Sequence, residues 1–269
     1  MEQPYAFPLE YQTVLTPDYR TDQETLQNFS LLQELKFSGV ELNITEPKQI
    51  DVKDLKDFLA GFELVMGQFA SGLAAKTFNL SLSSPDPNHR KASVDKCKTY
   101  IDFAAAFDAG VILGYAKGGV SSDPAAARCA YKESLNELVA HAEKTSTPIL
   151  TEATNRYETS VVNSLDETYD LVKDFESSCA RILPDTFHMN IEEKDMLGAL
   201  KIYADRYQLF HFSDNNRFLP GLGAIDFQPI VEFLKENQYQ GWIGLEGNIQ
   251  DNVRDDLRAT MKYLGPVLE

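Results

Sequence analysis

The chain has 269 residues, of which 43% are apolar, and this size fits one α/β barrel better than two separate domains. Lysine and arginine total 25 against 41 aspartates and glutamates, and the resulting net charge of −16 argues against a nucleic-acid partner because it repels phosphate backbones. No apolar run approaches the roughly 18 residues that a membrane helix needs. Residues 1–4 carry neither a basic nor an apolar signal region, so we expect a cytoplasmic protein with no membrane partner.

The first half of the chain alternates strand-like apolar runs with segments of helical spacing. Pro124 stands in the first turn of one such helix, and a long loop through residues 83–87 precedes another. We expect strands within residues 9–16, 39–44, 62–69 and 111–115, and helices over residues 25–36, 52–60, 89–107 and 124–144.

The second half continues the same alternation. Ser164 and Asp226 are the expected N-caps of two of its helices. We expect strands over residues 148–152, 180–185, 207–212 and 242–246, and helices over residues 164–176, 196–206, 226–236 and 253–264. Eight strands that are each followed by a helix predict the α/β class, in the form of a single (β/α)8 TIM barrel that spans residues 1–269 without an interdomain linker.

Four side chains of the metal-ligand type each follow a short apolar run, and they are Glu152, Asp185, His211 and Glu246. They are 33, 26 and 35 residues apart, which is close to one strand plus one helix and their connections. Because the C-terminal ends of barrel strands converge on one mouth, we expect the four to meet there. Three carboxylates and one imidazole suit Mn²⁺, Mg²⁺ or Co²⁺ better than a structural Zn²⁺ site.

Other polar residues are weaker candidates. Glu41 ends the second strand, but a structural role explains it equally well, so we leave it out of the site. His89 and His141 fall in helices and are expected to be solvent-facing or hydrogen-bonded, and Gly221 and Gly223 are expected in a tight loop that positions Arg217. The cysteines are odd in number and lack CxxC spacing, so we expect reduced thiols at Cys97, Cys129 and Cys179.

The segments around these residues resemble a known superfamily. They read EATNRYE over residues 152–158, DTFHMN over 185–190, HFSDNNR over 211–217 and PGLGAID over 220–226. These motifs resemble the xylose-isomerase-like TIM-barrel superfamily, and within it the ketose 3-epimerases related to D-tagatose 3-epimerase. The motif matches lie between strands five and eight, whereas the loops after strands one to three cannot be assigned to substrate contacts.

The resemblance implies a metal-dependent sugar epimerase with a small-molecule sugar as its partner. It implies one divalent ion on Glu152, Asp185, His211 and Glu246, preferably Mn²⁺, with Mg²⁺, Co²⁺ or Zn²⁺ as alternatives. It also implies that Glu152 and Glu246 act as the acid–base pair. The substrate contacts that it implies are Glu158, His188 and Arg217. His188 lies three residues after Asp185, where we expect the strand to give way to a loop.

Several activities fit this site. A metal that polarises a ketone allows one carboxylate to remove the C3 proton and the other to return a proton to the opposite face, which is C3 epimerisation through an enediolate. Return of the proton to the neighbouring carbon would instead give an aldose–ketose or hydroxypyruvate-type isomerase. A polyol dehydratase, a sugar-binding protein without activity and an endonuclease-IV-like repair enzyme are weaker alternatives. The sugar and its phosphorylation stay open, as does the oligomeric state, with a homo-oligomer among the options.

Overall fold

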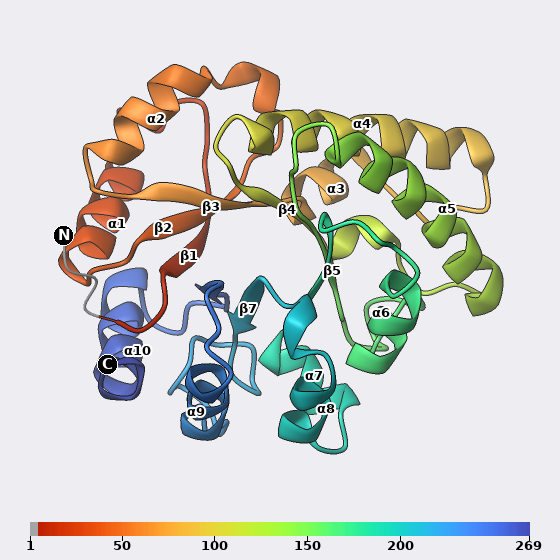
Figure 1. Ribbon diagram of the computed structural model, residues 1–269. Helices are drawn as coiled ribbons and strands as arrows, with labels where there is room; N and C mark the ends of the chain where they lie inside the picture. Colours follow the sequence, from red (N-terminus) through yellow and green to blue (C-terminus); the bar gives the residue numbers. More distant parts are fainter. Residues whose placement is uncertain (1–4) are drawn as a thin grey trace.

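The computed structural model describes residues 5–269 (Figure 1) and has at its centre a parallel sheet of eight strands in the order β6-β5-β4-β3-β2-β1-β8-β7. Isolated bridges from Ile182 to Tyr207 and from Asp185 to His211 join the two ends of this order, so the sheet closes into the predicted (β/α)8 barrel. The strands are β1 Leu9–Val14, β2 Gly39–Asn43, β3 Val65–Ala70, β4 Gly110–Leu113, β5 Ile149–Glu152, β6 Ala180–Leu183, β7 Leu209–Phe212 and β8 Trp242–Leu245.

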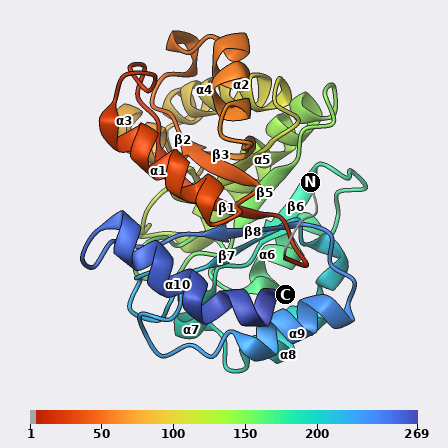
Figure 2. The ribbon, with the colours of Figure 1, turned by 90° about the vertical axis from the view of Figure 1, so that its left-hand side faces the viewer.

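The helices surround the sheet and connect its strands (Figures 1 and 2). The last helix, α10, lies beside the first, α1, and Arg258 Nη2 is 2.7 Å from Glu34 Oε1 across this contact. The helices are α1 Gln23–Glu34, α2 Val52–Ala60, α3 Gly72–Phe78, α4 Pro87–Ala105, α5 Pro124–Ala142, α6 Leu165–Val172, α7 Thr186–Glu192, α8 Met196–Ile202, α9 Gln228–Glu236 and α10 Val253–Leu268.

Two short helices were not expected from the sequence, and both lie at the mouth. Helix α3 follows β3 directly, and α7 follows β6. Asp185 is the N-cap of α7, where its side chain accepts hydrogen bonds from the backbone N–H groups of Phe187 and His188. The expectation that His188 lies in a loop is therefore wrong, because this cap starts a helix at the end of the strand.

Most other boundaries agree with the sequence to within a few residues. Strand β3 starts at Val65 rather than residue 62, because a turn with Glu63 at a positive φ of 60° precedes it. Helix α9 has Phe227 as its N-cap rather than Asp226, although Asp226 still accepts a hydrogen bond from the Gln228 N–H. Pro124 and Ser164 occupy the expected positions at the start of α5 and α6.

The interior of the barrel is divided by polarity. The strands β4 to β7 contribute an apolar cluster that packs against Trp242, and it consists of Ile112, Leu150, Leu183 and Leu209. On the opposite side β1, β2 and β3 place three polar side chains in fully buried positions, namely Glu10, Glu41 and Gln68. Buried polar groups normally have hydrogen-bond partners, so these three side chains are candidates for a role beyond packing of the core.

Within residues 5–269 no helix combines the length and the apolar character needed to cross a membrane. Residues 1–4, which enter the expectation of a cytoplasmic location, lie outside the described residues, and that expectation stays a prediction.

Candidate metal centre and active site

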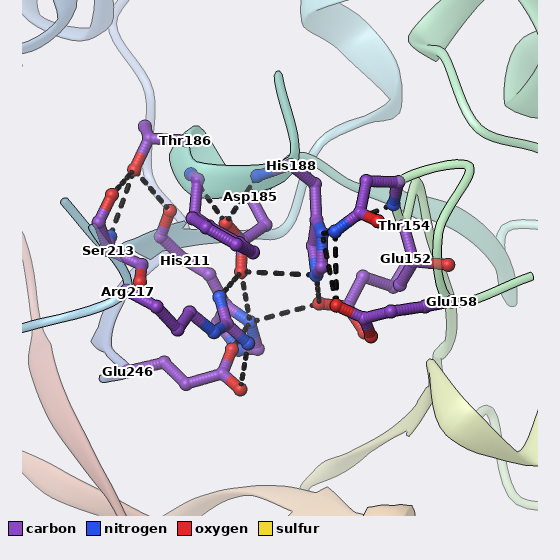
Figure 3. Close-up of polar contacts among 12 residues, drawn as sticks. Glu152, Thr154, Glu158, Asp185, Thr186, His188, His211, Ser213, Arg217 and Glu246 are labelled. Atoms are coloured by element: carbon purple, nitrogen blue, oxygen red, sulfur yellow. Dashed lines mark hydrogen bonds and ion pairs between the residues drawn. The ribbon is translucent and has the colours of Figure 1, made fainter. Parts of the chain in front are cut away.

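The four predicted ligands meet at the C-terminal mouth of the barrel (Figure 3). Glu152 is the last residue of β5 and His211 lies within β7, while Glu246 directly follows β8 and Asp185 lies two residues after the end of β6. One ligand atom from each residue lies within 4.8 Å of the others. The strand ends converge as the barrel geometry requires, and the resulting group could hold a metal ion.

The cluster forms one wall of a cavity of about 270 Å³. Glu152, His211 and Glu246 line it together with all three predicted substrate contacts, which are Glu158, His188 and Arg217. Asp185 is fully buried behind this lining. All of the predicted site residues except Asp185 therefore line one cavity.

Two buried atoms of the cluster have no hydrogen-bond partner among the described residues, namely His211 Nδ1 and Glu246 Oε2. They lie 2.6 Å apart, and His211 Nδ1 is also 3.5 Å from Glu152 Oε1 and 3.8 Å from Asp185 Oδ2. Buried polar atoms are normally satisfied, so a nitrogen and three carboxylates that face one another fit a divalent cation between them.

The ionisation of the carboxylates favours the same interpretation. Burial by itself would raise the pKa of Asp185, but Arg217 and His188 outweigh it and hold that pKa well below its usual value. The pKa of Glu246 is also lowered, since Arg217 and His211 act against the effect of burial. Both groups therefore remain charged, as oxygen ligands for a metal must be.

Arg217 contacts the cluster directly. Its Nη1 is 2.6 Å from Asp185 Oδ2 and its Nη2 is 2.5 Å from Glu246 Oε1 (Figure 3). The backbone of Arg217 has a positive φ of 64°, and the loop that holds it is organised by the buried Asp214, whose Oδ2 accepts from the N–H groups of Gly221 and Gly223. The two glycines thus lie in a tight loop near Arg217, as expected.

Glu41, which the sequence analysis left out, contacts the cluster from the far side of the barrel. Its Oε2 lies 2.8 Å from His211 Nε2, and its Oε1 accepts a hydrogen bond of 2.6 Å from Gln12 Nε2. When Nε2 carries the proton and donates to Glu41, Nδ1 keeps a free lone pair that faces the cluster. This contact links β2 to β7, and no local sequence motif around Glu41 predicts it.

Lys117 is a second residue that the sequence analysis missed. It lies after β4, is fully buried, and donates hydrogen bonds to the backbone carbonyl of Glu152 and, at 2.9 Å, to Thr154 Oγ1. Burial lowers the pKa of Lys117 to about 7, although the charge of Glu152 acts in the opposite direction. Lys117 therefore holds the end of β5 in place from the short 3₁₀ helix Tyr115–Lys117 that follows β4.

The expectations for the three cysteines and for His89 and His141 agree with the structure. Cys97, Cys129 and Cys179 are free thiols. His89 is hydrogen-bonded to Asn79 O at 2.7 Å, and His141 is 2.7 Å from Asp102 Oδ1, so both are satisfied outside the cavity.

Comparisons with known proteins agree with this geometry. A family model described as "Xylose isomerase-like TIM barrel" matches residues 29–265. A ketose 3-epimerase from Arthrobacter globiformis is 28% identical over 229 residues, which cover 84% of this chain and 78% of that protein. A D-psicose 3-epimerase from Enterocloster bolteae is 35% identical over 122 residues, but this match covers 45% of the chain and only 40% of the length of that relative.

Solved structures share the same architecture. A crystal structure of D-allulose 3-epimerase from Methylomonas sp. superposes with a TM-score of 0.82 over 100% of both chains, at 20% sequence identity. At this identity the likeness shows the fold.

Proposed function

The chain belongs to the xylose isomerase-like TIM-barrel family, and from this premise we propose that it is a metal-dependent sugar epimerase that inverts C3 of a ketose. The observation that carries the proposal is the buried group of Glu152, Asp185, His211 and Glu246, which lines or backs a cavity of sugar size. The match to a ketose 3-epimerase along most of the chain supports the same class of reaction. We also propose that residues 1–269 form a single barrel domain.

We assign these four side chains as the ligands of one divalent ion, with Mn²⁺ preferred. When bound, the ion supplies Lewis acidity that makes the proton next to the substrate ketone easier to remove. Glu41 supports this assignment because it contacts the edge of His211 that faces away from the cluster.

Glu152 and Glu246 are proposed as the acid–base pair. Both approach the same atom, His211 Nδ1, at 3.5 Å from Glu152 Oε1 and 2.6 Å from Glu246 Oε2 (Figure 3). We propose that a substrate carbon bound between the two carboxylates presents one face to each. One carboxylate takes the C3 proton to leave an enediolate, and the protonated form of the other gives a proton to the opposite face. The lowered pKa of Glu246 favours the charged form that can accept a proton.

The remaining polar residues of the cavity are proposed to orient the sugar. Arg217 and His188 offer N–H donors to the carbonyl and hydroxyl oxygens, and Glu158 offers an acceptor. Arg217 also neutralises charge on Asp185 and Glu246, so its role includes holding these carboxylates in place.

Proton exchange with solvent tests the proposal. The Mn²⁺-loaded protein is incubated in D₂O with D-psicose, L-ribulose, D-tagatose and D-fructose, and the products are followed by NMR. We expect deuterium at C3 together with the C3 epimer, and loss of both after treatment with a chelator. Deuterium confined to C1 or C2 with an aldose product would assign the protein to the aldose–ketose isomerases instead. Binding without exchange would make it a sugar-binding protein.

A further inference from the structure

Asn155 connects two of the cavity residues from a position where its own side chain does not face the sugar. It is 2% exposed and lies in the loop that follows β5. Its backbone N–H donates to His188 Nδ1 at 3.2 Å, and its Nδ2 lies 2.8 Å from the same atom. Its Nδ2 also donates to Glu158 Oε1 at 3.0 Å.

These contacts fix where the protons lie. The Asn155 Oδ1 accepts from the backbone N–H of Tyr157 at 3.0 Å, so the oxygen and nitrogen of the amide cannot be exchanged. A backbone N–H can only donate, and therefore His188 Nδ1 must act as the acceptor. The proton of the neutral imidazole is then on Nε2.

The Nε2 edge of His188 faces the reaction centre. It lies 3.7 Å from Glu152 Oε1 and 3.9 Å from Asp185 Oδ2, which is beyond ordinary hydrogen-bond length. The N–H on this edge is therefore available to an oxygen of a molecule in the cavity, which His188 lines.

The loop that carries Asn155 is attached to α7 at a second point. The next residue, Arg156, places its backbone N–H 2.6 Å from Glu192 Oε1 and its Nη2 2.6 Å from Glu192 Oε2. Glu192 lies four residues after His188 on the same helix face. Two consecutive loop residues thus hold two successive turns of α7, which sets the loop and the imidazole relative to each other.

We propose that Asn155 is a positioning residue that holds His188 Nδ1 as a hydrogen-bond acceptor, so that the N–H of Nε2 faces the cavity, and that it aims the carboxylate of Glu158 at the cavity. The inference rests on the proposed function for its catalytic consequence. The Nε2–H next to the acid–base pair donates to the substrate oxygen on which negative charge develops. Glu158, held by the same amide, accepts from a substrate hydroxyl.

The tautomer can be measured on the resting protein without substrate. We would load ¹⁵N-labelled protein with diamagnetic Mg²⁺ and record the imidazole nitrogens by NMR; the chain has 4 histidines, and His188→Gln assigns the signal. We expect a directly bonded proton on Nε2 and an unprotonated Nδ1. A proton on Nδ1 in the wild-type protein would overturn the inference, and this outcome does not depend on any variant.

Two substitutions separate the contributions of Asn155. Asn155→Asp places a carboxylate at the amide position 2.8 Å from Nδ1, where its negative charge outweighs the longer backbone N–H contact of 3.2 Å. We therefore expect a proton to move onto Nδ1 and kcat to fall by roughly 10²-fold to 10³-fold, the effect of losing an oxyanion donor. Asn155→Ala keeps the backbone donor, so we expect the Nε2–H form to persist while KM rises through the loss of the Glu158 contact.

Asn163→Asp is the matched control. Asn163 lies in the same loop and donates from Nδ2 to Thr154 O at 2.8 Å and Thr159 O at 3.1 Å, but it touches neither His188 nor Glu158. We expect this control to lower the melting temperature and to leave the His188 signals unchanged. An unchanged tautomer in Asn155→Asp would contradict the inference. Absence of ketose turnover by the wild type would instead count against the proposed function, because the tautomer is read independently.

Discussion

The two halves of the barrel contribute differently to the same cavity. The half from β5 to β8 supplies every proposed ligand, and Arg217 of the same half contacts the side chains of Asp185 and Glu246. The buried Lys117, which follows β4, donates to the backbone carbonyl of Glu152. The half from β1 to β4 supplies most of the outer wall, where Val14 and Tyr115 are each 51% exposed and Lys76 is exposed as well. We therefore expect the half from β5 to β8 to determine the chemistry and the exposed side chains of the other half to shape the space for the substrate.

Several buried contacts join the two halves, and one of them reaches the side chain of a proposed ligand. Glu41 on β2 contacts His211 on β7, and Gln12 on β1 in turn contacts Glu41. If the division between the halves is real, substitutions in one half should change turnover and metal binding, and those in the other should change the choice of sugar.

The largest effect is expected in the half from β5 to β8. Glu152→Gln and Glu246→Gln should each lower turnover by roughly 10²-fold or more, because each removes one proton-transfer group. Metal content is measured on both variants, since both residues are also proposed ligands. If a variant keeps its metal and more than half of the wild-type kcat, the substituted residue does not belong to the acid–base pair.

The second prediction tests the contact between the halves. Glu41→Gln should lower metal affinity about 10-fold to 100-fold, because the amide supports the His211 imidazole less well than the carboxylate does. Isothermal titration with Mn²⁺ measures the change. Wild-type affinity in this variant would mean that β1 and β2 do not take part in the metal centre.

The third prediction concerns the outer wall. Lys76 Nζ lies 4.9 Å from the centre of the Tyr115 ring, and both residues line the cavity. Lys76→Ala and Tyr115→Ala should change the ratio of kcat/KM between D-psicose and L-ribulose by about 10-fold, the scale of one altered pocket contact. Their Mn²⁺ affinity should stay at the wild-type level. Val65→Ala is the matched control, because Val65 is the first residue of β3 and lies at the end of the strand away from the mouth. This variant should change neither the kcat/KM ratio nor the Mn²⁺ affinity.

The smallest effect is expected at Glu10, which is fully buried with both carboxyl oxygens lacking a hydrogen-bond partner among the described residues. Burial, reinforced by Glu41, raises the pKa of Glu10 well above its usual value of 4.5. The folded state thus holds a proton that the unfolded chain releases, and stability falls as the pH rises above 4.5 toward the raised pKa.

Glu10→Gln removes this titration. The stability of the variant relative to the wild type should therefore increase from pH 5 to pH 8. Denaturant unfolding at the two pH values measures the difference. If the difference in unfolding free energy between the variant and the wild type is the same at pH 5 and pH 8, Glu10 is not held neutral in the folded protein.

The sequence by itself was sufficient for the fold and for the set of candidate ligands. Alternating strand and helix patterns predict the barrel, and in a barrel every strand ends at the same mouth. Polar residues that end successive strands, such as Glu152 and His211, must therefore approach one another, and the structure brings them together. The helices α3 and α7 were not predicted because each follows its strand almost directly, and seven residues in that position carry too little periodicity to distinguish a helix from the loop expected there.

Tertiary structure alone decided the residues that support the site. Glu41 and His211 are 170 residues apart, and whether Glu41 points at the imidazole depends on the register of β2 in the closed sheet. Lys117 and Asn155 act through backbone groups and ring nitrogens of other elements, 35 and 33 residues away. Such contacts have no local sequence pattern, because they depend on distances between elements that exist only after the barrel has closed.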